Sequence, residues 1–448
     1  GKGRIWCTMA KIGKPHSLAA QLLAEMIRLD TSNPPGNEEI AVQFLEGELA
    51  KEGIRSEVFM PEPRRANILA RLKGKKAGRP VVLLGHLDVV PAHDEGWVEP
   101  PFSGAVRDGF IYGRGAIDMK SQVVCHLLAF IDLARSGVTP ERDIIFLATA
   151  DEETSGPLGV EHVLHKVDDL PRASFVLSEG GFITDGNGMT HARVSVGEKQ
   201  VCWFMMRATG RGGHGSMPHK DNANDKIVRA AHRIISEKRP LRPTPIVTRY
   251  LNGLLRGRKV GGMTFSSLRE ALKHKGFRAF VEDDPALNSL LSNSVALTML
   301  QAGDKVNVIP PESVAYFDAR ILPDVEHEAF LEKVRKTAGP EVEVSLVNES
   351  RSVPSPYNTP YFRYIARVVR GLAGPIPVLP FMTTGATDLR HFRSLGIPAY
   401  GIFPMFLPDE EHMRMHGVNE RLSVASLEEG LNATGEIVRS LASYAPPG

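Results

Sequence analysis

The alternation of apolar strands and helices in this chain of 448 residues stops near residue 195 and returns after residue 351. Before the break we expect strands at residues 67–72, 81–88 and 143–150 and helices at 17–29, 38–52 and 120–135. After residue 351 we expect helices at 361–371, 386–395 and 426–442 and a strand at 399–403. Such alternation with short breakers is typical of a layered α/β domain. The pattern therefore predicts one α/β domain with a mixed sheet, interrupted by a second domain.

The interrupting segment follows another order: strand, helix, two strands, helix, strand. These elements are expected at residues 199–209, 222–236, 294–301, 313–321, 325–337 and 341–347. This order is that of a ferredoxin-like α+β domain. Residues 238–293, with a basic patch at 256–259, form an extra insert within it. We therefore predict 1–194 and 349–448 as the two parts of the α/β domain, and 195–348 as the inserted domain.

Composition excludes several classes of protein. Hydrophobic residues make up 42% and charged residues 24% of the chain, which is typical of a globular protein and excludes disorder or a coiled coil. The formal net charge of +2 creates no large field, so nucleic acid is not an expected partner. No apolar run reaches the roughly 18 residues that a membrane span needs.

The compartment is predicted from the N-terminus and the cysteines. The first residues include basic side chains but no apolar block long enough for a signal peptide. We therefore expect a cytoplasmic protein, or a secreted one whose leader has been removed. Cys7, Cys125 and Cys202 are few and widely spaced, which favours the first option. We interpret all three as structural thiols.

Histidine or acidic side chains occur in four segments that follow apolar strands or a glycine-rich turn. These are His86 with Asp88, Asp118, the acidic run 151–153, and Glu179. Strand ends are where open α/β sheets bind ligands. Each segment alone has a plainer interpretation: the first pair can close a strand, Asp118 can cap a helix, and the acidic run can be a solvated loop.

As a set, these side chains describe a cation site, because neighbouring carboxylates repel one another unless a cation neutralises them. Imidazole and carboxylate without thiolate suit zinc, cobalt or manganese more than calcium. Strand alternation places His86 and Asp88 on the same side, so a carboxylate can fix the far nitrogen of a metal-bound ring. Three acids and a hydroxide would balance two divalent ions, which leaves Glu152 beside a metal-bound water as a general base.

The same segments strongly resemble the co-catalytic zinc amidohydrolase and peptidase family, which contains aminoacylase, acetylornithine deacetylase, succinyl-diaminopimelate desuccinylase, glutamate carboxypeptidase and Gly-X carboxypeptidase. The resemblance extends from about Ser17 to Leu441. Its motifs are Gly-His86-Leu-Asp88, Gly-Arg-Gly-Ala-Ile-Asp118-Met-Lys, Asp-Glu152-Glu153-Thr-Ser-Gly, Ser-Glu179-Gly, Gly-Gly-His214-Gly-Ser, Asn307-Val-Ile-Pro, Asp318-Ala-Arg320, Gly385-Ala-Thr-Asp and Met-His416-Gly-Val-Asn-Glu420.

The resemblance implies a pair of Zn²⁺ ions, with Co²⁺ or Mn²⁺ as substitutes, bridged by Asp118. One ion is then completed by His86 and Glu179. The other is completed by Glu153 and His416.

The resemblance also implies that Glu152 takes a proton from the water between the metals and returns it to the leaving amine. Asp88 is expected to orient His86, and the peptide bond after Asp118 is expected to be cis. His412 lies four residues before the last ligand, but no Glu follows it and its flanks suit a loop, so it is not an expected ligand.

In similar proteins the inserted domain is a lid that also forms the dimer. His214 is then implied to face the oxyanion of the tetrahedral intermediate, across a dimer interface, where a donor lowers the barrier most. Asn307 and Arg320 are implied to hold the substrate carboxylate, because a guanidinium binds a carboxylate through two hydrogen bonds. Gly385 is implied as a further substrate-binding residue.

We therefore predict a metal-dependent hydrolase that cleaves an amide bond next to a free α-carboxylate, in a small N-acyl amino acid or short peptide. Glu rather than Asp at position 179 resembles the aminoacylase and carboxypeptidase branch. The extra insert resembles Gly-X carboxypeptidase and the N-fatty-acyl-amino-acid hydrolases. The alternatives are a dipeptidase or aminopeptidase of the same family and a non-catalytic metal-binding homologue. A homodimer through the lid is the expected assembly.

Two other enzyme classes are excluded by missing motifs. The glycine-rich segment 210–216 lacks the Gly-Lys-Ser/Thr ending of a phosphate-binding loop. The Gly-x-Ser-x-Gly elbow of the α/β serine hydrolases does not occur.

Overall fold

The computed structural model describes residues 17–185, 189–255, 259–260 and 262–444. The chain divides into two compact units. The first unit comprises Gly1–Val194, Pro356–Val378 and Ile397–Gly448, and the second comprises Ser195–Ser355 and Leu379–Gly396. The second unit therefore includes residues 379–396, which the sequence pattern assigns to the α/β domain. The physical reason is that buried Glu198 accepts hydrogen bonds from Thr387 and Arg393.

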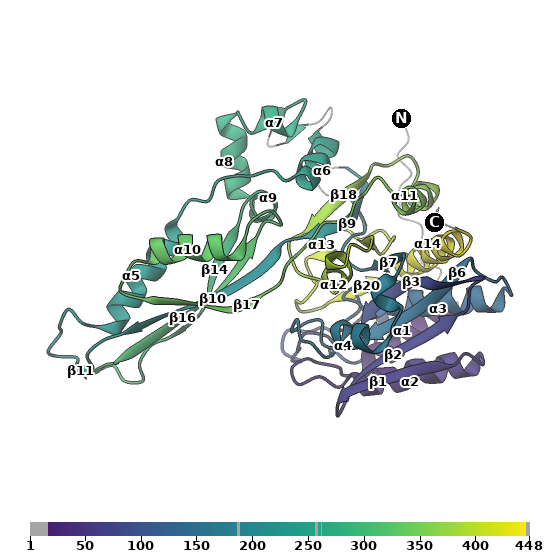
Figure 1. Ribbon diagram of the computed structural model, residues 1–448, viewed down its shortest axis with the longest axis horizontal. Coiled ribbons are helices and arrows are strands. Elements are labelled where there is room, and N and C mark those ends of the chain that lie inside the picture. The colour runs from purple at the N-terminus through teal and green to yellow at the C-terminus, as the bar shows by residue number, and fades with distance from the viewer. Residues whose placement is uncertain (1–16, 186–188, 256–258, 261, 445–448) are drawn as a thin grey trace. The chain divides into compact units, whose positions relative to one another are not determined.

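A large mixed sheet forms the centre of the first unit, with strand order β1-β2-β6-β3-β7-β19-β9-β18 (Figure 1). β3 is parallel to β6 and β7, and β19 is parallel to β7, whereas β2 is antiparallel to β1 and β6. β9 and β18 continue into the second unit. The strands are β1 (Ser56–Glu62), β2 (Arg65–Leu72), β3 (Lys76–His86), β6 (Arg142–Thr149), β7 (Phe175–Ser178), β9 (His191–Glu198), β18 (Val378–Thr383) and β19 (Ala399–Gly401).

The central strands are covered on both faces. Every residue of β6 is buried, as is the second half of β3, and parallel strands in this position consist of continuous apolar runs. α3 packs against β3 and β6, and α1 and α14 pack against α3. The helices of this unit are α1 (Leu18–Arg28), α2 (Glu38–Lys51), α3 (Lys120–Arg135), α4 (Val160–Lys166), α11 (Pro360–Ala373), α13 (Asp409–His412) and α14 (Val424–Ala442), with the 3-10 turn η1 (Leu170–Arg172).

Side-chain caps define where several of these helices begin. Ser17 accepts a hydrogen bond from the backbone N–H of Ala20 at the start of α1. Thr359 caps α11, whose first residue is Pro360, and Ser423 caps α14. Hydroxyl caps satisfy N–H groups that have no partner within the helix, and proline suits the first helical position.

The second unit contains an antiparallel sheet with strand order β14-β16-β10-β17. α5 and α10 pack on one face of this sheet and bury alternate residues of β10 and β16, such as Phe204 and Phe317. This order of elements is the predicted ferredoxin-like one. The elements are β10 (Gln200–Thr209), α5 (Ala223–Ser236), β14 (Ser294–Gln301), β16 (Glu312–Ile321), α10 (His327–Ala338), β17 (Glu343–Glu349) and, from the later segment, α12 (Leu389–Ser394).

The extra insert between α5 and β14 is largely helical. Its apolar side chains pack among themselves, as in the edge-to-face contact of Phe265 with Phe277. The insert contains α6 (Pro245–Leu255), β12 (Lys259–Val260), β13 (Met263–Thr264), α7 (Leu268–Ala271), α8 (Lys275–Asp283) and α9 (Pro285–Leu291).

The predicted fold class, a mixed α/β domain interrupted by an inserted α+β domain, is confirmed. Several short strands were not predicted, because they have too few residues for a periodic pattern. They are β4 (Val106–Arg107), β5 (Phe110–Tyr112), β8 (Ile183–Thr184), β11 (Gly213–His214), β15 (Val308–Ile309) and β20 (Arg421–Ser423).

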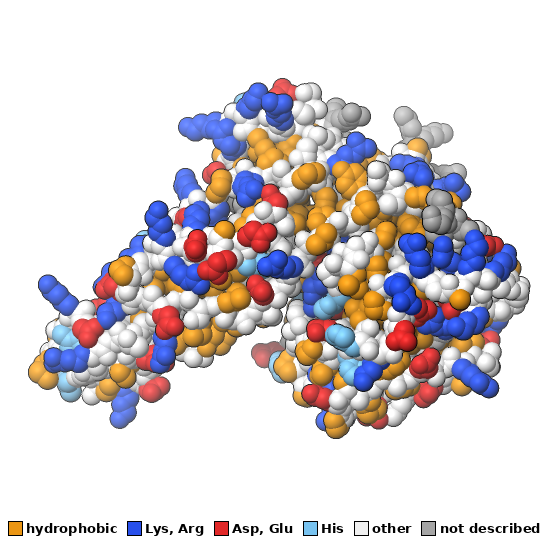
Figure 2. Space-filling model, in the orientation of Figure 1, with side chains coloured by type: hydrophobic (Ala, Val, Ile, Leu, Met, Phe, Trp, Pro, Cys, Tyr) orange, Lys and Arg blue, Asp and Glu red, His pale blue; other side chains and the backbone are white. Residues whose placement is uncertain are grey.

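The described surface shows Lys and Arg side chains interspersed with Asp and Glu on the face seen in Figure 2. None of the helices in the described ranges is long and apolar enough to cross a membrane. Cys125 and Cys202 are buried free thiols, as expected, whereas Cys7 lies outside the described residues.

Candidate metal centre

The predicted metal ligands of the first unit come from the ends of three strands and from two loops. His86 is the last residue of β3, and Asp118 lies in the turn before α3. The peptide bond between Asp118 and Met119 is cis, as expected. Glu153 lies in the loop after β6, Glu179 directly after β7, and His416 in the loop before β20.

Asp118 lies between two histidines and presents a different oxygen to each. Its Oδ1 is 3.0 Å from His86 Nε2, and its Oδ2 is 3.0 Å from His416 Nε2. The two histidines are separated from Asp118 by 32 and 298 residues in the sequence. A carboxylate that faces two imidazoles with its two oxygens has the arrangement of a group that can bridge two cations.

Three further carboxylates surround this pair of contacts. Glu179 Oε1 and Glu152 Oε2 lie 3.5 and 3.9 Å from His86 Nε2. Glu153 Oε1 lies 3.4 Å from His416 Nε2. The structure therefore brings together all five predicted ligands and the predicted base.

The close contact of these buried groups shifts their pKa values strongly. Burial alone would lower the pKa of His86, but the charge of Glu179 and the hydrogen bond to Asp118 raise this pKa well above its ordinary value. The hydrogen bond to Asp118, together with the nearby carboxylate of Glu153, raises the pKa of His416 to about 10. Burial, and then the negative charge of Asp118, raises the pKa of Glu179 to about 8. The cluster therefore favours added positive charge.

The donor set fits divalent cations. In the part of the chain that the structure describes, no Lys or Arg forms an ion pair with Asp118, Glu153 or Glu179. Glu153 Oε1 is buried and accepts no hydrogen bond there. Two groups have ligand atoms within 4.8 Å of one another: His86 with Glu152 and Glu179, and His86 with Asp118 and Glu153. Imidazole and carboxylate ligands suit Zn²⁺, Co²⁺ or Mn²⁺.

Asp88 orients the site in two ways. Its backbone carbonyl oxygen lies 2.9 Å from His86 Nδ1, while its Oδ1 lies 3.6 Å from the same nitrogen. The ring can therefore donate from Nδ1 to the carbonyl, which leaves the lone pair of Nε2 for a metal. The Asp88 carboxylate accepts hydrogen bonds from the backbone N–H groups of Glu152 and Glu153. It thus positions the loop that carries the base.

A buried network that the sequence analysis missed supports this loop. Asn33 donates to Asp88 Oδ2 at 2.9 Å and to Asp151 Oδ1 at 3.1 Å. Arg65 donates to the same Asp151 oxygen and forms a two-pronged ion pair with Glu38, which is fully buried. The only signal in the sequence is the Thr-Ser-Asn-Pro-Pro breaker, which predicts a loop and no more.

Glu420 also supports the site. It belongs to the His416 motif, but the sequence did not predict a role for it. Its Oε1 accepts hydrogen bonds from the backbone N–H groups of Ile117 and Asp118 at 2.8 and 3.2 Å. Its Oε2 accepts one from Arg114 at 2.6 Å. Glu420 therefore fixes the turn that presents Asp118, and its short distance from His416 in the sequence was the available signal.

In the second unit, His214 and Asn307 lie close together. β11 pairs with β15, and the N–H of Gly215 donates to the carbonyl oxygen of Asn307 at 2.8 Å. The backbone N–H of Ser216 donates to His214 Nδ1, so the proton of the neutral ring is on Nε2. His214 is exposed and can donate a hydrogen bond from Nε2.

Arg320 lies elsewhere in the second unit. It pairs in register with Val201, whereas Glu312 at the other end of β16 pairs with Thr209, near β11. Glu312 and Arg320 are eight residues apart on an extended strand, so about 26 Å separates them. Both Arg320 and Asn307 are predicted to hold the substrate carboxylate. The second unit of a single chain therefore does not bring these two residues together. Gly385 is exposed in the loop after β18.

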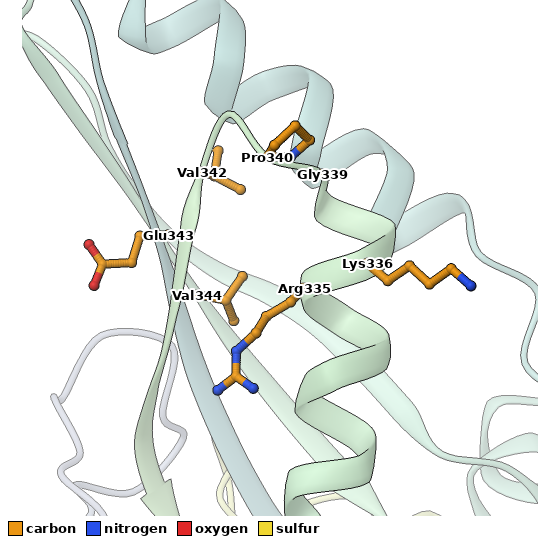
Figure 3. A pocket seen from close by; sticks show the side chains of 7 residues that line it. All are labelled: Arg335, Lys336, Gly339, Pro340, Val342, Glu343 and Val344. Atoms are coloured by element: carbon orange, nitrogen blue, oxygen red, sulfur yellow. The ribbon is translucent and has the colours of Figure 1, made fainter.

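One cavity lies in the second unit away from these residues. It has a volume of about 480 Å³ and lies between α10 and β17 (Figure 3). Val342 and Val344 face the gap, whereas Lys336 and Glu343 point away from it. Arg335 also lies toward the gap, but it donates to Glu328 at 2.6 Å, so the lining offers one already paired charged group and not several that converge on a ligand.

Comparison with known proteins identifies the chain. Residues 82–440 match the model of peptidase family M20/M25/M40. The chain belongs to this family. As a member of peptidase family M20/M25/M40, it is a metallopeptidase or amidohydrolase, and the predicted enzyme class is confirmed.

The relatives of this M20 protein include enzymes that act on N-acyl amino acids. N-fatty-acyl-amino acid synthase/hydrolase PM20D1 of Mus musculus is 32% identical over 390 residues, which cover 82% of this chain and 75% of the relative. Aminoacylase-1 of Sus scrofa is 28% identical and covers 94% of this chain and 95% of the relative. The M20 family metallo-carboxypeptidase Sso-CP2 from Sulfolobus solfataricus has the same fold, with a TM-score of 0.76, 17% identity and coverage of 95% of this chain and 99% of that chain.

Proposed function

We propose that the protein hydrolyses the amide bond of an N-acyl amino acid or of a C-terminal residue in a short peptide. The observation that carries the proposal is the placement of Asp118 between His86 and His416, with three carboxylates around them. The names of two relatives, an N-fatty-acyl-amino acid synthase/hydrolase and an aminoacylase, support the substrate class.

Two Zn²⁺ ions are the proposed cofactors, with Co²⁺ or Mn²⁺ as substitutes. Asp118 would hold both ions, His86 and Glu179 one of them, and Glu153 and His416 the other. When bound, the ions would polarise the scissile carbonyl and make a nearby water more acidic.

Glu152 is the proposed general base. Its carboxylate is largely buried, with 8% of the residue exposed, and lies beside the ligand cluster. We infer that it accepts a proton from the attacking water and then gives it to the leaving amine. One carboxylate can perform both steps, because the amine needs the proton that the water loses.

Arg320 is the proposed anchor for the substrate α-carboxylate. A guanidinium can form two parallel hydrogen bonds to this group, which fixes its position as well as its charge. Gly385 is proposed to bind substrate through its backbone. A side-chain carbon added to Gly385 would meet no heavy atom within 4 Å, so a substrate has room beside it.

His214 and Asn307 are proposed to act in the site of a second copy. The scissile carbonyl and the α-carboxylate of one substrate are only three bonds apart. Arg320 lies at one end of the β10–β16 pair, and β11, which carries His214, follows the other end of β10, so the two side chains of one second unit cannot both contact such a molecule. A homodimer through this unit would supply His214 Nε2 from one copy as the oxyanion donor, and Arg320 from the other.

A substrate panel tests the proposed function. Metal-loaded protein would be assayed with N-acetyl-, N-octanoyl- and N-palmitoyl-methionine and with the free-amine dipeptide glycyl-methionine. We expect hydrolysis of at least one N-acylmethionine with a higher kcat/KM than that of the dipeptide. The opposite order would favour the dipeptidase alternative, and no hydrolysis of any amide would favour the non-catalytic homologue.

A further inference from the structure

Arg320 does not extend freely from the sheet. Its Nε and Nη2 donate to Asp318 Oδ1 and Oδ2 at 2.7 and 3.1 Å, so the ion pair is two-pronged. Asp318 and Arg320 are two residues apart on β16 and therefore lie on the same face of the sheet. Their side chains are 33% and 23% exposed.

Asp318 is itself held by the neighbouring strand. The indole Nε1–H of Trp203, on β10, donates to Asp318 Oδ1 at 2.9 Å. The guanidinium carbon of Arg320 lies 5.6 Å from the centre of the Trp203 ring. The guanidinium of Arg320 is thus held by Asp318 along one side and lies near the ring of Trp203. Arginines held by a carboxylate and an aromatic ring often bind planar groups such as carboxylates.

The remaining edge of Arg320 is available. A guanidinium has five N–H donors, and the side-on pair with Asp318 uses two of them. Among the described residues, none accepts a hydrogen bond from Nη1 of Arg320. The free edge, formed by Nη1 and the second N–H of Nη2, has the two donors that a second carboxylate needs.

Asp318 also balances positive charge at this end of the sheet. Lys199 is fully buried and donates to the carbonyl oxygens of Ser289 and Ser292 at 3.0 and 2.9 Å. Burial, and then the charge of Arg320, lowers the pKa of Lys199 to about 7, while Asp318 opposes this shift. Asp318 therefore lies where two cationic side chains would otherwise repel each other.

We propose that Asp318, held by Trp203, is a positioning residue that fixes Arg320 with its Nη1/Nη2 edge free for the substrate α-carboxylate. This inference rests on the proposed function of Arg320. An arginine held in this way has already lost the side-chain freedom that binding would otherwise remove. The expected contribution to affinity is about threefold to tenfold.

Asp318→Glu is the sharpest test because it keeps the negative charge and moves the carboxylate by one methylene. Asp318→Asn would also remove a charge that repels the substrate, and the two effects would oppose each other. The substrate is the N-acylmethionine that is hydrolysed fastest in the panel, compared with its C-terminal carboxamide. The matched control is Asp324→Glu, which alters an exposed Arg–Asp pair in the same unit, that of Arg242 Nη2 with Asp324 at 2.7 Å.

We expect Asp318→Glu to raise KM for the carboxylate substrate about threefold to tenfold, with kcat within about twofold, and to reduce the preference over the carboxamide by the same factor. Trp203→Phe removes only the indole donor and should have a smaller effect in the same direction. Asp324→Glu should match the wild type. In an Arg320→Ala background, Asp318→Glu should cause no further loss.

Two results would overturn the inference: an unchanged KM in both Asp318→Glu and Trp203→Phe, or a loss that persists in the Arg320→Ala background. The second result would mean that Asp318 acts on the fold and not through Arg320. A separate result bears on the proposed function: if Arg320→Ala itself keeps the preference for the carboxylate, then Arg320 is not the anchor.

Discussion

In the first unit, candidate residues that are distant in the sequence meet at hydrogen-bond distance, as His86 and His416 do on either side of Asp118. In the second unit, Arg320 lies at one end of the paired strands β10 and β16, whereas His214 lies on β11, which follows the other end of β10. The first set is partly buried and its charges oppose one another. In the second set His214 is exposed and Arg320 is half-buried, and each is hydrogen-bonded to residues near it in the sequence. The difference leads us to propose a preassembled metal centre in the first unit and separate binding groups in the second.

The largest expected effect is in the first unit. Glu152→Ala should reduce kcat by about 10²-fold to 10⁴-fold, because the attacking water loses its proton acceptor. The metal content should remain that of the wild type, since the ligand residues are unchanged. Steady-state kinetics on the metal-loaded protein measures this, with the exposed Glu161→Ala as the control. A Glu152→Ala variant as active as the wild type would remove this residue from the proposed mechanism.

The next effect concerns the second unit. His214→Ala should reduce kcat by about 10²-fold to 10³-fold, the usual cost of removing an oxyanion donor. If His214 acts in the site of another copy, then mixing His214→Ala with Glu152→Ala should restore activity, because some mixed dimers contain one intact site. Unfolding and refolding the two variants together allows the exchange. Activity no greater than the sum of the separate variants contradicts a shared site.

A smaller effect is expected from the network that supports the metal centre. Asn33→Leu removes the donor shared by Asp88 and Asp151 and should lower metal affinity about tenfold to 100-fold. The kcat of the fully metal-loaded variant should change less than its affinity. Competition with a chelator of known affinity measures the change. Unchanged affinity would mean that Asp88 needs no support from Asn33.

The smallest effect is a pH dependence in the second unit. The pKa of Lys199 is lowered to about 7 by burial and by Arg320, and unfolding restores its ordinary value. Between about pH 7 and the ordinary pKa of lysine, 10.5, the Lys199 side chain is protonated in the unfolded chain but not in the folded one. The contribution of Lys199 to the free energy of unfolding therefore rises with pH across this window, on the order of 1 kcal/mol per pH unit.

Lys199→Met should remove this slope. Urea unfolding of the metal-loaded protein at pH 7.5 and pH 9 measures it, and Lys333→Met, at a more exposed position, is the control. Equal slopes in the wild type and in Lys199→Met would show that the buried lysine keeps its ordinary pKa.

The fold and the first-unit site could be predicted because their signals are local. Strand ends such as 81–88 combine an apolar run with a histidine, and several of them in order specify both a sheet and a site. The supporting partners could not be predicted in the same way. Glu38 and Arg65 are each ordinary in the sequence, and only the folded chain reveals their buried ion pair.

The second unit shows the limit of motifs more clearly. The motifs of Asn307 and Arg320 suggest one shared task, because both are typical of carboxylate recognition. The length of β16 separates Arg320, near its end, from Asn307, which precedes its start, and a linear motif contains no information about this separation. Trp203 was likewise missed, since an aromatic residue in a strand is usually explained by packing alone.

The most direct test is the number of metal ions bound at saturation, measured by elemental analysis of zinc-loaded protein. If Asp118 bridges two cations, the wild type should bind two equivalents of zinc, and His86→Ala and His416→Ala should each retain about one. A wild type that binds a single equivalent, or two histidine variants that both retain the full content, would contradict a paired centre.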